Sequence, residues 1–369
     1  MEKTYTYEIL PEYLYENWET KHLYVNCVDK DDDTVYQIYE GDFYTIDVID
    51  DSEKSRTDFI DYIIDWETAC EIRTFVNPRT DEDHLRASQI KKFVIHQFLT
   101  NPSSQGVLVS FFLRNNVRFN TDNAYEKIDS LLKRNNYSIT RDSELVRLCL
   151  ETELAQSYIH DLYWVRLEAP RGSSFFLGES PLFLLNLIDS DCVGDPFIPY
   201  GCTGTILFMP LSPKYAVAIY DGEVYDLKTK TLTRKDVETY NAITVGLSQN
   251  VILSDVNKEI PRYRKAKERS ETEELSIADF RPSVFSVKKD CSGENCGYRE
   301  YVRDVMEYDR KYLSEKEDIF DIYNRSVHTS DTMRIMADHI IRRIERRKQE
   351  SAGEKSDGSC VEQKGENEE

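Results

Sequence analysis

The chain has 369 residues, which is enough for one large domain or two ordinary ones with a hydrophobic core. Hydrophobic residues make up 40% of it, and its 24 Tyr and 16 Phe each bury a large area, so the composition excludes a chain that is disordered throughout. The formal net charge is −21, and such an acidic surface repels phosphate backbones and anionic lipids over most of its extent.

The sequence predicts neither a membrane span nor export. It contains no apolar run of about 18 residues, the length that a membrane helix needs. Residues 1–10 lack the apolar core of a signal peptide. Eight Cys are scattered through a long chain, so we expect reduced thiols and a cytoplasmic location.

The N-terminal part predicts a β-hairpin followed by helices. Residues 22–28 and 34–39 are rich in β-branched and aromatic side chains, and an acidic turn at 29–33 joins them. Apolar residues at helical spacing then predict a series of helices. Their ranges are a helix from 57 to just before Asn77, then 81–99, 124–134 and 143–164.

After Pro170 the pattern becomes that of short strands. We expect strands at residues 174–177, 203–209, 215–220, 223–227 and 250–254, and a helix at 235–247. Asp221-Gly222 lies between the third and fourth of these strands and is the strongest signal for a tight hairpin in the chain.

From Asn257 onward the composition is charged, with helices expected at 298–312 and 332–347. From Gln349 the residues are mainly Glu, Lys, Gly and Ser, which predicts a disordered tail. The predicted fold is therefore α+β: an N-terminal β-hairpin, a helical middle, an antiparallel sheet from about Ser174 to Ser254 and a charged helical C-terminal extension. The expected divisions are a domain at 1–256, the extension at 257–348 and the tail at 349–369.

Three stretches carry a family resemblance. They are Phe-Phe-Leu-Gly-Glu-Ser-Pro at 175–181, Ile-Leu-Phe-Met-Pro-Leu-Ser-Pro-Lys at 206–214, and the segment 237–254 around Asn241. Together they resemble the bacterial family known as domain of unknown function 4238, whose pattern has an opening His-x-x-Pro-x-x-Tyr-Leu segment, a helical middle, two proline-bearing strand ends and a late helix with an Asn. The resemblance runs from about Tyr7 to Asp255 and implies no particular activity.

The chain departs from the family pattern at three polar positions. Pro11 and Gln97 fit the pattern, but Glu8 stands where the family has His, Thr100 where it has Arg, and Glu179 where it has Asp. If these polar residues form a site in the family, the resemblance implies that the site is altered or partly lost in this chain.

Two of the candidate site residues, Glu179 and Ser212, lie at predicted strand ends. Glu179 could serve as a general base or metal ligand, or accept backbone N–H groups in a turn. Ser212 could be a nucleophile, but the Gly-x-Ser-x-Gly elbow is absent, so its hydroxyl is better explained as the cap of a turn. Asn241 falls inside a predicted helix and could bind a ligand or hydrogen-bond the neighbouring strand ends. The candidate binding residues are Pro11, Gln97, Glu179, Ser180 and Asn241.

Residues 29–40 place acids where a calcium loop has its ligands. The sixth position is Thr34, where that loop needs Gly, and the flanking segments predict strands, so an acidic hairpin tip is the better interpretation.

Two further spacings are weak. Arg79 and His84 match a short signature of helical ribonucleases, and Cys291 and Cys296 form a lone pair where a structural zinc needs four ligands. We therefore predict no metal site and no cofactor.

Two classes of function follow. The first is an intracellular binding or regulatory protein with a polar cleft where Glu179 and residues 210–213 meet the helix that carries Asn241. The alternative is a metal-dependent hydrolase or nuclease of a bacterial stress or phage-defence system. The first requires fewer unseen residues.

Basic stretches are the candidates for a nucleic-acid contact. One runs from Arg262 to Arg269 and the other from Arg342 to Lys348. Both are equally typical of solvated helix faces whose charges pair with nearby Glu. A protein partner is the other class of partner that we consider, and no membrane contact is expected.

Overall fold

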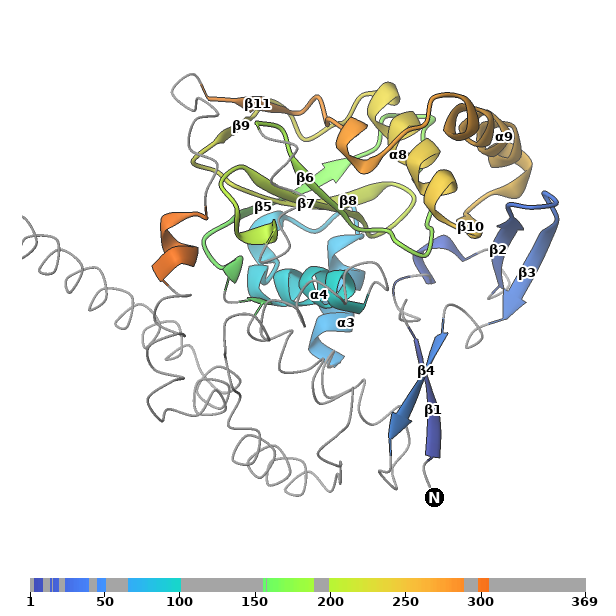
Figure 1. Cartoon of the computed structure of the whole chain (residues 1–369), viewed down its shortest axis with the longest axis horizontal. Helices are drawn as coiled ribbons and strands as arrows, with labels where there is room; N and C mark the ends of the chain where they lie inside the picture. Colours follow the sequence, from blue (N-terminus) through green and yellow to red (C-terminus); the bar gives the residue numbers. More distant parts are fainter. Residues whose placement is uncertain are drawn as a thin grey trace, which may run out of the picture.

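The centre of the protein is a four-stranded antiparallel sheet (Figure 1). The computed structural model describes residues 3–8, 14, 16–19, 24–39, 45–50, 66–100, 155–156, 158–188, 199–288 and 298–304. The strand order is β5-β8-β7-β6. The strands are β5 (Tyr163–Glu168), β6 (Phe183–Asn186), β7 (Thr205–Pro210) and β8 (Tyr215–Tyr220).

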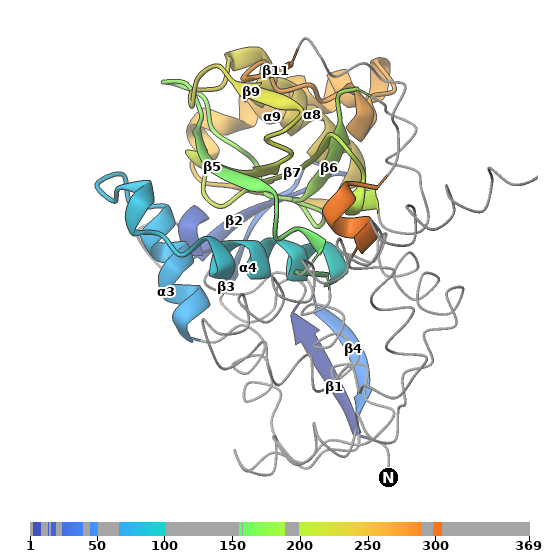
Figure 2. The ribbon, with the colours of Figure 1, turned by 90° about the vertical axis from the view of Figure 1, so that its left-hand side faces the viewer.

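Both faces of this sheet are covered (Figures 1 and 2). On one side lie helices α3 (Trp66–Phe75) and α4 (Ala87–Thr100). On the other lie helix α8 (Arg234–Leu247) and the two-stranded ladder of β9 (Tyr225–Leu227) and β11 (Phe285–Val287). Because both faces are covered, every residue of the central strand β7 is buried, which explains its continuous apolar sequence.

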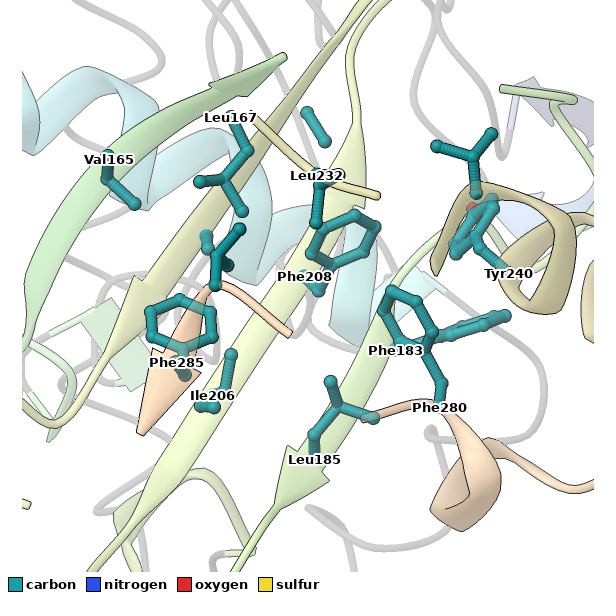
Figure 3. Close-up of a cluster of buried hydrophobic side chains, with 14 of the residues drawn as sticks. Val165, Leu167, Phe183, Leu185, Ile206, Phe208, Leu232, Tyr240, Phe280 and Phe285 are labelled. Carbon is teal, nitrogen blue, oxygen red and sulfur yellow. The ribbon is translucent and has the colours of Figure 1, made fainter. Parts of the chain in front are cut away.

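The face toward α8 forms the main hydrophobic core (Figure 3). Alternate residues of the strands point to it, together with side chains from α8 and from the segment before β11. Ring centroids of Phe183 and Tyr240 lie 4.5 Å apart, and those of Phe208 and Phe280 lie 4.8 Å apart. Burial raises the pKa of Tyr240 well above its usual range, so its hydroxyl stays protonated and donates to the Pro181 carbonyl at 2.7 Å.

The opposite face is joined to α3 by one arginine. Arg166 of β5 donates to the carbonyl oxygen of Phe75, the last residue of α3, at 2.8 Å, and to that of Thr80 in the following loop at 2.7 Å. Its guanidinium lies 5.3 Å from the centroid of the Tyr215 ring. These bonds satisfy carbonyl groups that the helix end leaves unpaired, and they fix α3 to the sheet.

A second, three-stranded sheet has the order β10-β2-β3. Strands β2 (Tyr24–Asp29) and β3 (Val35–Tyr39) form the predicted hairpin, and β10 (Asn250–Leu253) pairs with β2. Strands β1 (Lys3–Glu8) and β4 (Thr45–Asp50) form a separate ladder. Helix α9 (Val256–Thr272) follows β10 and packs against α8, where it buries Tyr263 and Ala266.

Short 3-10 helices connect these elements. They are η1 (Glu16–Trp18), η2 (Glu82–His84), η4 (Pro199–Gly201) and η5 (Ile277–Asp279). The indole of Trp18 donates to the Phe175 carbonyl at 3.1 Å and is fully buried, so η1 is fixed to the core.

The predicted α+β class is confirmed, as are most of the predicted strands and helices after residue 200. Residues 256–287, the first part of the expected extension, contribute α9, Phe280 and β11 to the packed structure. The helices predicted at 124–134 and 332–347 and the tail from 349 lie outside the described residues.

Three predictions are wrong. The strand expected at 174–177 is an extended segment with one isolated bridge, from Leu177 to Ile252. The helix predicted to reach Trp164 ends near residue 158, and Trp164 belongs to β5. The hairpin at Asp221-Gly222 is absent, because β8 pairs with β5 and β7 while β9 pairs with β11. The buried Asp221 carboxylate accepts from Gly204 N at 2.9 Å and Glu223 N at 3.0 Å, and this turn directs the chain away from β8.

His96 of α4 makes stability depend on pH. Burial, with a smaller effect of nearby Lys92, lowers the pKa of His96 to about 3. Because its ordinary pKa is 6.5, the unfolded chain takes up a proton below pH 6.5 that the folded protein refuses, so stability falls as pH falls from 6.5 toward 3. Between pH 7 and pH 5, the free energy of unfolding measured with urea should fall by about 2 kcal/mol less in His96→Leu than in the wild type. An equal loss in both proteins would contradict this assignment.

Candidate functional site

The side chain of Asn241, a predicted site residue, holds a neighbouring segment of the backbone in place. Its side-chain amide is buried in α8, where its Oδ1 accepts from Phe176 N at 3.0 Å and its Nδ2 donates to the Ser174 carbonyl at 2.9 Å. Both ends of the amide are therefore engaged by the backbone of the extended segment 174–176, so the side chain holds this segment against α8.

Ser212 caps a turn. Its hydroxyl oxygen accepts from Tyr215 N at 2.9 Å and from Lys214 N at 3.3 Å, and the residue is buried. These bonds hold the tight connection between β7 and β8, as an ST turn does. The geometry agrees with the capping interpretation rather than with an exposed nucleophile.

Glu179 lies half-buried beside the end of α8. Its carboxylate accepts from Asn250 N at 3.3 Å, and its own N–H donates to Ser248 Oγ at 3.2 Å. The preceding Gly178 has no room for a side chain, since a Cβ there would lie 2.1 Å from Ser248 Oγ. Glu179 and the half-buried Ser180 that follows it thus continue a segment packed closely on α8 and β10.

Gln97, which also fits the family pattern, does not join this group. Gln97 is buried in α4, which the central sheet separates from Asn241 in α8 (Figure 1). Glu8 is the last residue of β1 and Thr100 the last of α4, while Pro11 lies outside the described residues. The structure therefore brings together Asn241 and the segment that carries Glu179, but not Gln97.

A cleft of about 500 Å³ lies beside Asn241, which is one of its lining residues. Its volume is typical of small-molecule sites. Three elements line it: the turn at 172–174, the N-terminal half of α8, and α9. The lining residues are Gly172, Ser173, Ser174, Arg234, Lys235, Val237, Glu238, Asn241, Arg262, Lys265, Ala266, Arg269 and Glu273.

Three of the five basic residues come from one face of α9. Arg262, Lys265 and Arg269 follow one another at intervals of three and four residues, which places them on one side of a helix. Arg269 is held in place, since it donates to Thr239 Oγ1 at 3.0 Å and to the Glu273 carboxylate at 2.8 Å. Lys265 lies 3.6 Å from the carboxylate of Glu238 on α8.

The other two basic residues open α8. Thr233 and Asp236 form a capping box that fixes the start of this helix directly before Arg234 and Lys235. Both basic side chains are exposed, and within the described part of the chain neither has a hydrogen bond or ion pair. The positive end of the α8 macrodipole lies at the same place, so it adds to the attraction that these two side chains exert on an anion.

A buried carboxylate supports the inner wall of the cleft. Glu259 accepts hydrogen bonds from the hydroxyls of Ser174 and Ser254, the latter at 2.9 Å, and from Asp255 N at 3.1 Å. Arg262 Nη1 lies 3.4 Å from Ser174 Oγ. Ser174 is thus fixed by Glu259 on one side and by Asn241 on the other, so the cleft has a rigid wall.

Two acids of the calcium-like pattern, Asp29 and Asp33, make contacts within the protein. Asp29 Oδ1 accepts from Asp31 N at 2.8 Å, and Asp33 pairs with Lys267 of α9 at 2.7 Å. Across all residues with described positions, no group of three or more His, Cys, Asp or Glu is placed to hold a metal ion. Arg79 and His84 are both exposed, and His84 belongs to η2.

Residues 10–257, about two thirds of the chain, match the family described as a protein of unknown function, DUF4238. The chain belongs to this family. No curated protein and no solved structure shows a significant match to it. Within the DUF4238 match lie Arg234, Lys235 and Asn241, whereas the three basic residues of α9 follow it. No helix among the described residues is long and apolar enough to cross a membrane.

The sequence pattern indicates the basic stretch on α9, but not the other residues that line the cleft. It does not distinguish Arg234, Lys235 or the turn at 172–174 from other exposed residues. The local signal that could have found the first two is the Thr233–Asp236 capping box, which marks a helix start immediately followed by two cations.

We predict that Asn241→Leu destabilises the protein even when no ligand is present. The substitution leaves the Phe176 N–H and the Ser174 carbonyl without partners in a buried position, which costs about 2–4 kcal/mol. Urea unfolding of the variant measures the loss. Glu238→Gln, at a half-exposed position one turn earlier in α8, is the matched control and should change the free energy of unfolding by less than about 0.5 kcal/mol. An unchanged urea midpoint of unfolding for Asn241→Leu would contradict this structural role.

Proposed function

We propose that this protein binds a small anionic ligand in the cleft between α8 and α9, and acts inside the cell as a binding or regulatory protein. The observation that carries the proposal is the charge of the lining: five basic side chains and two acids surround one space of about 500 Å³. The whole chain has a net charge of −21, so this cleft is a local exception.

The local charge outweighs the distant charge for a small ligand. Charges farther away than about 8 Å are largely screened at physiological ionic strength, so a bound anion interacts mainly with the cleft itself. Arg234 and Lys235 have no ion pair with another described residue, and Arg262 has only a long contact with Ser174. These three side chains can therefore bind an anion without first releasing a carboxylate.

The cysteines among the described residues support the intracellular part of the proposal. Cys27, Cys70 and Cys202 carry free thiols. Burial raises the pKa of Cys27 to about 11, so this thiol stays protonated and unreactive at neutral pH. A chain that keeps such thiols fits a reducing compartment.

Isothermal titration calorimetry with pyrophosphate tests the proposal. The wild type should bind, and binding should weaken as salt is raised. Arg262→Gln and Lys235→Gln should each lower the affinity about tenfold, because each removes a charged hydrogen-bond donor. Arg264→Gln is the matched control: it removes an exposed cation from the same helix but outside the cleft, and it should bind like the wild type.

Two outcomes would contradict the proposal. One is binding that is absent in the wild type or equally lost in all three variants. The other is steady hydrolysis of RNA, DNA or nucleotides with Mg²⁺ or Mn²⁺ present, which would favour the alternative of a metal-dependent hydrolase or nuclease. Loss of that hydrolysis in Glu179→Ala would assign the reaction to the strand ends rather than to the cleft.

A further inference from the structure

The lining of the cleft is informative about the ligand beyond its charge. Resting on the proposed function, we infer that the ligand is a phosphorylated sugar or polyol: a compact molecule with more than one phosphoryl group and free hydroxyls. Three features of the lining lead to this class.

The first feature is the distribution of the cations. Arg234 and Lys235 stand at the start of α8, while Arg262, Lys265 and Arg269 stand on α9. Two groups of cations on two different helices face one space. This arrangement suits a ligand with two separate phosphoryl groups better than a single inorganic phosphate, because each group can be bound by its own set of donors.

The second feature is the pair of carboxylates among these cations. Glu238 lines the cleft from α8 and Glu273 from the end of α9. A carboxylate repels a phosphate but accepts strong hydrogen bonds from hydroxyl groups. Ser173 adds a hydroxyl that can donate or accept. A ligand that carries hydroxyls as well as phosphates satisfies both kinds of lining residue, whereas a ligand made of phosphate alone does not.

The third feature is the kind of apolar residue in the described lining. The apolar contacts come from Val237 and Ala266, and among the described residues that line the cleft there is no Phe, Tyr, Trp or His. Proteins bind nucleobases largely by stacking them on such rings. The described lining therefore offers no aromatic platform for the base of a nucleotide.

The charge of the chain as a whole disfavours a polymer. The net charge is −21, so a nucleic-acid strand that continued beyond the cleft would run over an acidic surface that opposes its phosphates. A compact ligand held inside the cleft interacts mainly with the cleft itself.

The test compares probe ligands by calorimetry on the full chain. Fructose 1,6-bisphosphate should bind about tenfold or more tightly than pyrophosphate, and fructose should not bind measurably. ATP and a ten-residue oligothymidylate should bind no better than pyrophosphate.

The variant Glu238→Gln separates the ligand class from simple anion binding. Removing this negative charge should raise the affinity for pyrophosphate. The affinity for fructose 1,6-bisphosphate should not rise, because a hydroxyl group of the sugar loses its strong hydrogen bond to the carboxylate. The preference for the sugar bisphosphate should therefore fall severalfold. Arg264→Gln, outside the cleft, should keep the wild-type preference.

The outcomes separate the two proposals. If ATP or the oligothymidylate binds more tightly than fructose 1,6-bisphosphate and Arg262→Gln weakens it, the ligand class is overturned and the anion-binding function stands. If Glu238→Gln leaves the preference unchanged, the assignment of hydroxyl binding is overturned. If no probe binds the wild type, both proposals fail.

Discussion

Helix α8 is buried on nearly every side, and this constraint organises the rest of the described structure. Val237, Tyr240 and Ile243 face the central sheet, while Ala242 and Val245 pack toward α9 and β10. A helix in this position can be enclosed only if its few polar side chains find partners. Asp236, Tyr240 and Asn241 meet that demand by binding the backbone of the neighbouring segments.

The same constraint creates the cleft. Asn241 holds residues 174–176 against α8, and Glu259 holds Ser174 from the α9 side. The turn at 172–174 is thereby fixed at a set distance from the two helices, and the space between them is lined by the basic residues that remain outside the core. Of the predicted site residues, Asn241 thus supports the wall of this cleft. The basic residues of α9, which the sequence allowed either as a nucleic-acid contact or as a solvated helix face, line it.

The strands and helices after residue 200 could be predicted because their patterns are local. Strands β7 and β8 are short apolar runs, and α8 has a start signal and helical spacing. The hairpin at Asp221 failed because the Asp221 carboxylate and the Tyr225 hydroxyl both bind Gly204, a residue far away in the sequence. The cleft could not be predicted for the same reason, since its lining comes from three segments whose proximity depends on the packing of α8.

The central claim is that the cleft between α8 and α9 is where this protein binds its ligand. Amide hydrogen–deuterium exchange of the full chain, with and without a large excess of fructose 1,6-bisphosphate, tests it most directly. We expect slower exchange confined to residues 172–174, the first half of α8 and the second half of α9. Slower exchange around Glu179 and residues 210–215 instead, with no change in the three cleft segments, would contradict the account.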